Sequence, residues 1–124
     1  MKILAPTSGP KPAKDNASYI VNITRSLEGE LFVLHILTPG AEGGEEALAI
    51  FEDEAEAAGV KVTGVVRKGA VVDNIARFAD EISADLIILG GSPGKMVAEW
   101  LMADFIVRSK RPMVIIPFGF EGAF

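Results

Sequence analysis

The chain has 124 residues, of which 49% are hydrophobic and 23% are charged, and its net charge is −5. This length fits a single domain spanning residues 1–124, and the apolar fraction is large enough for a core, which excludes a disordered chain. The acidic balance argues against a surface for nucleic acid. Because cysteine is absent and His35 is the single histidine, disulfides, thiolate metal sites and histidine-rich metal sites are excluded.

The apolar runs of the chain are far shorter than the roughly 20 residues that a membrane helix needs. The first residues lead directly into a predicted strand and lack the apolar region of a signal peptide. We therefore expect a cytoplasmic protein with neither a membrane nor a nucleic acid as its partner.

The first predicted strand, at residues 3–5, precedes a helix whose apolar positions recur every three or four residues as far as Leu27, with Gly29 as its stop signal. A second strand is predicted at 31–37. The helix after it has alanines and a phenylalanine on one side and glutamates on the other, and it ends at Gly59. We interpret its glutamates as a solvated face rather than a cation site.

A third strand is predicted at residues 60–66, followed by a regular amphipathic helix over 72–82. A fourth strand at 85–89 precedes a helix over about 93–109. Pro112 then opens the last strand, at 113–116.

Strands and helices therefore alternate, and the strands are unbroken apolar runs, typical of strands buried on both faces of a parallel sheet. Right-handed crossovers between such strands form an α/β doubly wound sheet of three layers, with helices on both faces. Ligands of these sheets bind at the carboxyl ends of the strands, where the strand order reverses. The candidate site segments are 6–12, 37–44, 67–71 and 90–95.

Segment 90–95, Gly-Gly-Ser-Pro-Gly-Lys, is the most informative of the four. Its glycines allow the backbone to approach a ligand closely, and Ser92 can cap a helix that begins at Pro93. The N–H groups of that helix end and the charge of Lys95 would attract an anion such as a phosphate. The alternative is a tight turn between strand and helix with no ligand.

Several segments, taken in order, resemble the universal stress protein family, and the resemblance spans residues 2–117. These segments are 3–9 (Ile-Leu-Ala-Pro-Thr-Ser-Gly), 34–36 (Leu-His-Ile), 67–70 (Arg-Lys-Gly-Ala), 75–79 (Ile-Ala-Arg-Phe-Ala), 84–90 (Ala-Asp-Leu-Ile-Ile-Leu-Gly) and 106–117 (Ile-Val-Arg-Ser-Lys-Arg-Pro-Met-Val-Ile-Ile-Pro). The resemblance implies a five-stranded parallel sheet of order 3-2-1-4-5, with the adenine nucleotide alpha hydrolase-like fold, in a dimer. It also implies a role in stress survival rather than a defined catalytic reaction.

Some members of this family bind ATP through the pattern G-x-x-G, nine residues, then G-S or G-T. Residues 91–94 match the first half of this pattern. In place of the glycine in the second half of the pattern stands an acid, which is Asp104 in one alignment and Glu99 in another. Ser8 stands where members that bind ATP have an aspartate facing the base.

The nucleotide contacts that the resemblance implies would fall at Thr7, Ser8, Ile36, Gly91, Ser92, Gly94 and Lys95. Because two of the three nucleotide elements depart from the family pattern, we predict a degenerate site in a non-enzymatic module that requires no cofactor. The alternative is a member that binds ATP, with slow ATP hydrolysis or nucleotide-gated signalling.

The last predicted strand carries no charge and lies at a sheet edge in the 3-2-1-4-5 order. Exposed apolar edges favour pairing with another chain. The helix before this strand has a second apolar stripe, which indicates burial on two sides or cover by a partner. We therefore predict a homodimer, with any other protein partner left open, whose interface includes Met113, Val114, Ile115, Ile116 and Trp100.

Other doubly wound classes fit the sequence poorly. A receiver domain needs acids after its first and third strands, where this chain has Ala-Pro-Thr and Arg-Lys-Gly. A flavodoxin needs a hydroxyl-rich phosphate loop after its first strand, and in this chain Pro10 interrupts that loop. The G-x-G-x-x-G pattern of dinucleotide-binding folds is also absent from that position. Thr7 and Ser8 have no histidine–acid pair to make them nucleophiles. His35 is predicted to be a hydrogen-bonded core residue.

Overall fold

A computed structural model describes residues 1–37, 43–90, 106–117 and 119–120 of the chain. In these ranges, five parallel strands form one sheet: β1 (Lys2–Thr7), β2 (Glu30–Leu37), β3 (Val62–Lys68), β4 (Leu86–Gly90) and β5 (Met113–Ile116). Their order is β3-β2-β1-β4-β5, which confirms the predicted doubly wound sheet.

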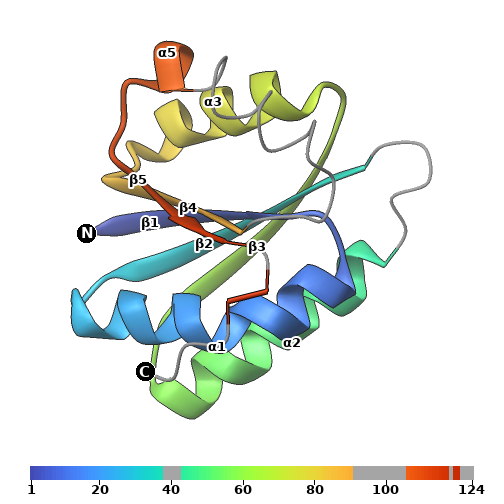
Figure 1. Cartoon of the computed structure of the whole chain (residues 1–124), viewed down its shortest axis with the longest axis vertical. Helices are drawn as coiled ribbons and strands as arrows, with labels where there is room; N and C mark the ends of the chain where they lie inside the picture. Colours follow the sequence, from blue (N-terminus) through green and yellow to red (C-terminus); the bar gives the residue numbers. More distant parts are fainter. Residues whose placement is uncertain (38–42, 91–105, 118, 121–124) are drawn as a thin grey trace.

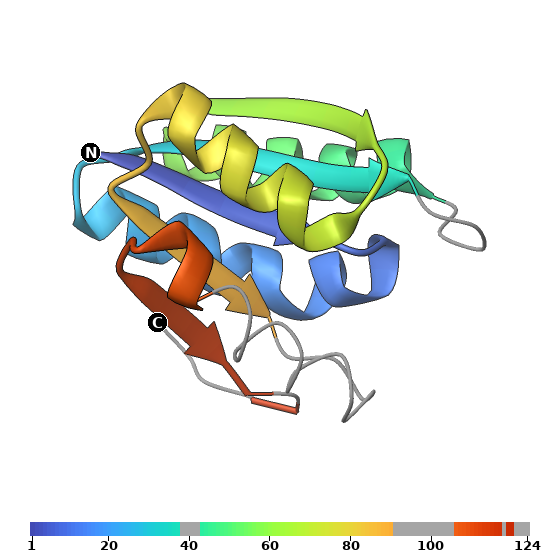
Figure 2. The same cartoon turned by 90° about the horizontal axis from the view of Figure 1, so that it is seen from above.

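Helices cover both faces of the sheet and complete the three layers. α1 (Pro10–Ser26) and α2 (Gly44–Ala58) lie on one face, and α3 (Val71–Ile82) and the short α5 (Ile106–Ser109) lie on the other (Figure 1, Figure 2). The helix predicted over 93–109 is described only from residue 106, and the rest of it lies outside the described residues. In the part of the chain that is described, no helix combines the length and hydropathy needed to cross a bilayer.

Two clusters of buried apolar side chains form the core, one on each face of the sheet. The first includes Ile3 and Phe51 and lies against α1 and α2, and the second includes Leu4 and Ile75 and lies against α3. Successive residues of a strand point to opposite faces, so neighbouring residues of β1 belong to different clusters. The unbroken apolar runs of the sequence therefore supply both layers.

The third strand begins at Val62, later than the predicted range of 60–66, because the end of α2 uses the residues before it. Gly59 has a φ of 70° and its N–H donates to the carbonyl of Glu56, while the N–H of Val60 donates to the carbonyl of Ala55. These bonds form a Schellman motif, in which the residue after the glycine packs against the helix. Val60 is accordingly buried in the first core cluster rather than paired in the sheet.

The first helix ends at Ser26, earlier than its predicted stop signal. Glu28, with a φ of 52°, makes the left-handed turn in place of Gly29. A glycine is still required at position 29, because a Cβ there would lie 2.9 Å from the carbonyl oxygen of Met1. Leu27, predicted to continue the buried stripe, is exposed because it lies beyond the last helical residue.

Candidate functional site

The carboxyl ends of the parallel strands lie along one edge of the sheet, where the sequence places its candidate site (Figure 2). Thr7 pairs with His35 in the β1–β2 register, so Thr7, Ser8 and Ile36 lie at the ends of adjacent strands. Continuing the β1–β4 register places Gly90 level with Thr7. The remaining predicted contacts lie outside the described residues, as does one predicted interface residue: Gly91, Ser92, Gly94, Lys95 and Trp100.

Thr7 takes part in the turn after β1. Its hydroxyl donates to the carbonyl of Gly9 at 3.3 Å, and its own carbonyl accepts from Nδ1 of His35 at 3.0 Å. Ile36 is buried and belongs to the core cluster against α3. Ser8, in contrast, is exposed. Of these three predicted contacts, Ser8 alone presents its side chain to solvent.

His35 is fully buried on β2, as predicted for a core histidine. Only one of its ring nitrogens is satisfied by the described residues, since Nε2 has no hydrogen-bond partner among them. Nothing in the sequence pattern indicates this unpaired nitrogen. Within the same ranges, the acidic and histidine side chains form no group of three or more that could hold a metal ion.

The turn after β3 is held by a buried amide, Asn74 of α3. Its Nδ2 donates to the carbonyls of Lys68 at 3.1 Å and Ala70 at 2.8 Å. Between them Gly69 has a φ of 120°, which favours glycine. Asn74 is not predicted from the sequence, because a polar residue in an amphipathic helix is expected to face outward. Its position four residues before the buried Phe78, on the same face of the helix, is the signal that could have found it.

The end of β4 is contacted by a second amide, Asn16 of α1. A Cβ at Gly90 would lie 2.5 Å from Nδ2 of Asn16, so the glycine leaves the space that this side chain occupies. The sequence carries no local signal for this contact, because the two residues are far apart along the chain. The start of the Gly-rich segment is therefore shaped by α1.

The two cations at the end of β3, Arg67 and Lys68 of candidate segment 67–71, have different surroundings. Arg67 donates to both carboxylate oxygens of Glu81, at 3.0 and 2.6 Å, and lies over the ring of Phe78, 5.0 Å from its centroid. These hydrogen bonds raise the pKa of Arg67 and lower the pKa of Glu81. The guanidinium is thus directed toward α3, whereas Lys68 is exposed at the strand end.

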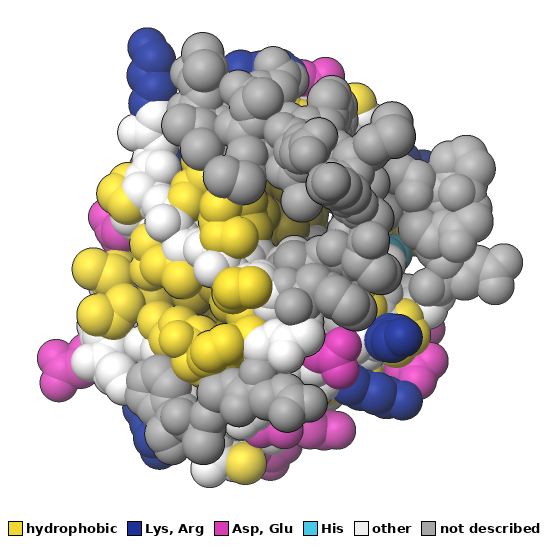
Figure 3. Space-filling view, viewed as in Figure 1, with side chains coloured by type: hydrophobic (Ala, Val, Ile, Leu, Met, Phe, Trp, Pro, Cys, Tyr) yellow, Lys and Arg dark blue, Asp and Glu magenta, His cyan; other side chains and the backbone are white. Residues whose placement is uncertain are grey.

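β5 lies at the edge of the sheet and, among the described strands, pairs with β4. Figure 3 shows apolar side chains gathered on the face that carries this strand. Ile115 is 41% exposed, and Met113 and Val114 are partly exposed. Ile116, also predicted at the interface, is instead 2% exposed and belongs to the core.

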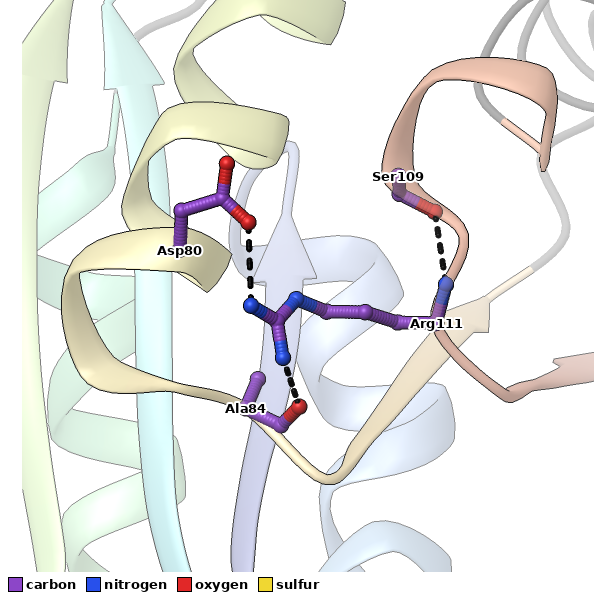
Figure 4. A network of polar contacts seen from close by, with 4 residues as sticks. All are labelled: Asp80, Ala84, Ser109 and Arg111. Atoms are coloured by element: carbon purple, nitrogen blue, oxygen red, sulfur yellow. Dashed lines mark hydrogen bonds and ion pairs between the residues drawn. The ribbon is translucent and has the colours of Figure 1, made fainter.

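The start of β5 is held against the end of α3 by Arg111 (Figure 4). Its Nη1 donates to the carbonyl of Ala84 at 2.5 Å, and its Nη2 donates to Oδ1 of Asp80 at 2.9 Å. The backbone N–H of Arg111 is 3.4 Å from Oγ of Ser109. One guanidinium therefore contacts the last turn of α3 and the residue that leads toward β4.

The sequence model of the universal stress protein family matches residues 40–108, more than half of the chain. The chain belongs to this family. The universal stress protein MJ0531 of Methanocaldococcus jannaschii is 28% identical, over 93% of this chain and 80% of the relative. These matches confirm the resemblance that the sequence segments indicated.

Solved universal stress proteins share the fold of this chain. One in complex with cAMP has a TM-score of 0.74 at 24% identity, covering 94% of this chain and 96% of the other. One from Archaeoglobus fulgidus in complex with dAMP has a TM-score of 0.73 at 19% identity, covering 94% and 97%. The predicted adenine nucleotide alpha hydrolase-like fold is thereby confirmed for this universal stress protein.

Proposed function

We propose that this universal stress protein is a non-enzymatic, dimeric stress-response module whose nucleotide site is degenerate. The observation that carries this proposal is the composition of the carboxyl edge. Thr7 uses its hydroxyl within its own turn, Ile36 is buried in the core, and Ser8 replaces the family's aspartate. A neutral hydroxyl is a weaker acceptor for the amino group of an adenine than a carboxylate is.

The phosphate side of the site supports the same proposal. In either alignment an acid, Asp104 or Glu99, replaces the glycine that precedes a hydroxyl in the ATP pattern. Two unit charges about 4 Å apart repel by roughly 4 kcal/mol at an effective dielectric of 20. A loss of that size weakens binding about a thousandfold, which turns a micromolar ATP site into a millimolar one.

A second function, binding of an adenosine monophosphate, is favoured by the relatives. Two structures that resemble this chain contain cAMP and dAMP, which carry fewer negative charges than ATP. A monophosphate meets less repulsion from a neighbouring acid and needs a smaller phosphate cradle. ATP binding with slow hydrolysis, or nucleotide-gated signalling, is the remaining alternative.

Thermal unfolding with each nucleotide separates these functions. A micromolar site at about 1 mM ligand adds roughly 4 kcal/mol to the free energy of unfolding, which raises Tm by many degrees in a domain this small. We expect no such rise with magnesium-ATP. A rise of that size would contradict the degenerate site, and a rise with AMP or cAMP alone would favour the second function.

The variant Ser8→Asp tests the base side of the site directly. It restores the carboxylate that ATP-binding relatives have, so we expect it to increase any Tm rise produced by AMP. Ser18→Asp, the same change on the exposed face of α1, is the matched control and should leave the nucleotide response unchanged. Equal responses of the two variants would contradict the role assigned to position 8.

We propose that the dimer forms through the β5 edge. The exposed Ile115 lies on an edge strand without charges, and unpaired apolar edges favour strand pairing with a second copy. On the α1 side of the sheet, Phe120 is also exposed, at 43%, and contacts the ring of Tyr19 edge-to-face at 5.2 Å between centroids. The β5 edge therefore has an exposed apolar side chain on the α3 side, and Phe120 adds one on the α1 side; exposed apolar surface of this kind marks interaction sites.

Light scattering coupled to gel filtration measures this association. We expect a dimer at tens of micromolar and a dissociation constant raised at least about tenfold by Ile115→Lys, because the lysine would place a charge in the apolar contact. Val66→Lys is the matched control: Val66 is similarly exposed, at 42%, but lies on β3 at the opposite edge. A monomeric wild type would overturn the proposed interface.

A further inference from the structure

The buried ring of His35 contacts two backbone segments that are far apart in the sequence. Nδ1 is 3.0 Å from the carbonyl oxygen of Thr7, in the turn after β1. On its other side the ring lies against Gly44, the first residue of α2, where a Cβ would be 2.9 Å from Nε2 and closer still to Cδ2. The ring therefore lies between the turn of residues 7–9, which follows β1, and the start of α2.

The hydrogen-bond partner of Nδ1 shows which nitrogen of the His35 ring carries a proton. A carbonyl oxygen only accepts hydrogen bonds, so Nδ1 must carry a proton to donate to Thr7. Nε2 has no hydrogen-bond partner among the described residues, and it lies beside Gly44 at the N-terminal end of α2. The geometry therefore fits a ring whose proton lies on Nδ1.

We infer that His35, which donates a hydrogen bond from Nδ1, is a positioning residue that fixes the turn of residues 7–9 against the start of α2. That turn carries Ser8, the exposed candidate contact at the carboxyl edge. The inference rests on the proposed function only for the location of the site. The positioning itself follows from the hydrogen bond to Thr7 and the contact with Gly44.

Replacing His35 by asparagine and by leucine tests the hydrogen bond. Asparagine has an N–H donor bonded to Cγ, as Nδ1 is, and leucine has the same branching without a donor. The reporters are the amides of Ala13 and Ala47, which donate to Gly9 and Gly43 in the first turns of α1 and α2.

We expect His35→Leu to speed hydrogen exchange of both reporters about tenfold, the effect of losing one buried hydrogen bond, and His35→Asn to restore exchange to within about threefold of wild type. The amide of Asn74, in the first turn of α3, is the control and should exchange at the wild-type rate in both variants. Equal exchange in the two variants would overturn the inference.

The contact with Gly44 is tested separately by a double-mutant cycle. Gly44→Ala places a methyl group against the ring, so its Tm loss in the wild type should be about halved or more in the His35→Asn protein, where the side chain is smaller. Equal Tm losses in the two backgrounds would show that the ring does not pack against this residue, and they would overturn the second half of the inference.

The protonation state has a spectroscopic test. A long-range ¹H–¹⁵N correlation spectrum of the His35 ring should show the pattern of the Nδ1–H tautomer at neutral pH. The Nε2–H pattern would overturn the inference, because Nδ1 would then be unable to donate to Thr7. None of these measurements requires a nucleotide or a dimer, so their failure is distinguishable from failure of the proposed function.

Discussion

Arg67 makes three interactions at once: two hydrogen bonds to Glu81 and a contact with the face of Phe78. The side chains of the ion pair are 32% and 44% exposed, so solvent screens much of their attraction. The hydrogen bonds nevertheless stabilise the charged carboxylate, which is why the pKa of Glu81 is lowered. The bidentate geometry also keeps Arg67 over the ring, where a cation is attracted to the aromatic face.

We expect this pair to make stability pH-dependent in acid. Because the folded-state pKa of Glu81 lies below its ordinary value of 4.5, its contribution is fully present above pH 4.5 and is lost as the pH falls through the lowered value. The urea midpoints of wild type and Glu81→Gln, compared at neutral pH and at about pH 3, should therefore converge in acid. In an Arg67→Met background the Glu81→Gln difference should depend much less on pH, because only the weaker attraction of Arg77 remains. A pH-independent difference in the wild type would contradict the pairing.

Among the elements, the edge strand β5 depends on contacts outside the sheet. It has four residues and, within the described strands, a single neighbour, so few backbone hydrogen bonds hold it. Arg111 supplies contacts to Ala84 and Asp80 directly before the strand begins. The carbonyl of Ala84 is fixed in the chain that leads into β4, whereas the Asp80 side chain is 72% exposed.

We expect Arg111→Ala to lower the free energy of unfolding by about 1.5–3 kcal/mol, the range for hydrogen bonds to charged groups. Asp80→Asn should cost less, because the exposed carboxylate forms an ion pair that water screens. Urea unfolding of both variants measures the difference. Equal costs would mean that the carboxylate, rather than the carbonyl of Ala84, carries the interaction.

The order of the elements could be predicted from the sequence, because the strands are short apolar runs and α1, α2 and α3 each have an apolar stripe. The exact ends could not, since they depend on bonds that periodicity does not show. Val60 looks like a strand residue but completes the end of α2, and Glu28 rather than Gly29 turns the chain after α1. Thr7 and Ser8 could be predicted at the site because ligands of doubly wound sheets bind at the carboxyl ends of the strands. Asn16 was missed because its partner lies on a strand distant in sequence.

The two core clusters of the whole molecule lie on opposite faces of one sheet, so neither helix layer can pack without the strands that both layers share. We expect Phe51→Ala, in the cluster against α1 and α2, to cost about 3–5 kcal/mol, and Ile75→Ala, in the cluster against α3, to cost about 2–5 kcal/mol. Circular dichroism in urea should give a single transition for each variant, because the loss of either layer exposes the shared sheet. Two separated transitions in either variant would contradict this coupling.

The contact between Asn16 and Gly90 has a consequence for how this protein can be changed. The amide of Asn16 already fills the volume into which a side chain at position 90 would grow. A substitution at position 90 therefore depends on which residue occupies position 16. A library that diversifies the end of β4 would yield folded variants with a larger residue at 90 only when position 16 is shortened in the same molecule, for example to glycine or alanine. The same pairing would appear as covariation between these two positions in a family alignment.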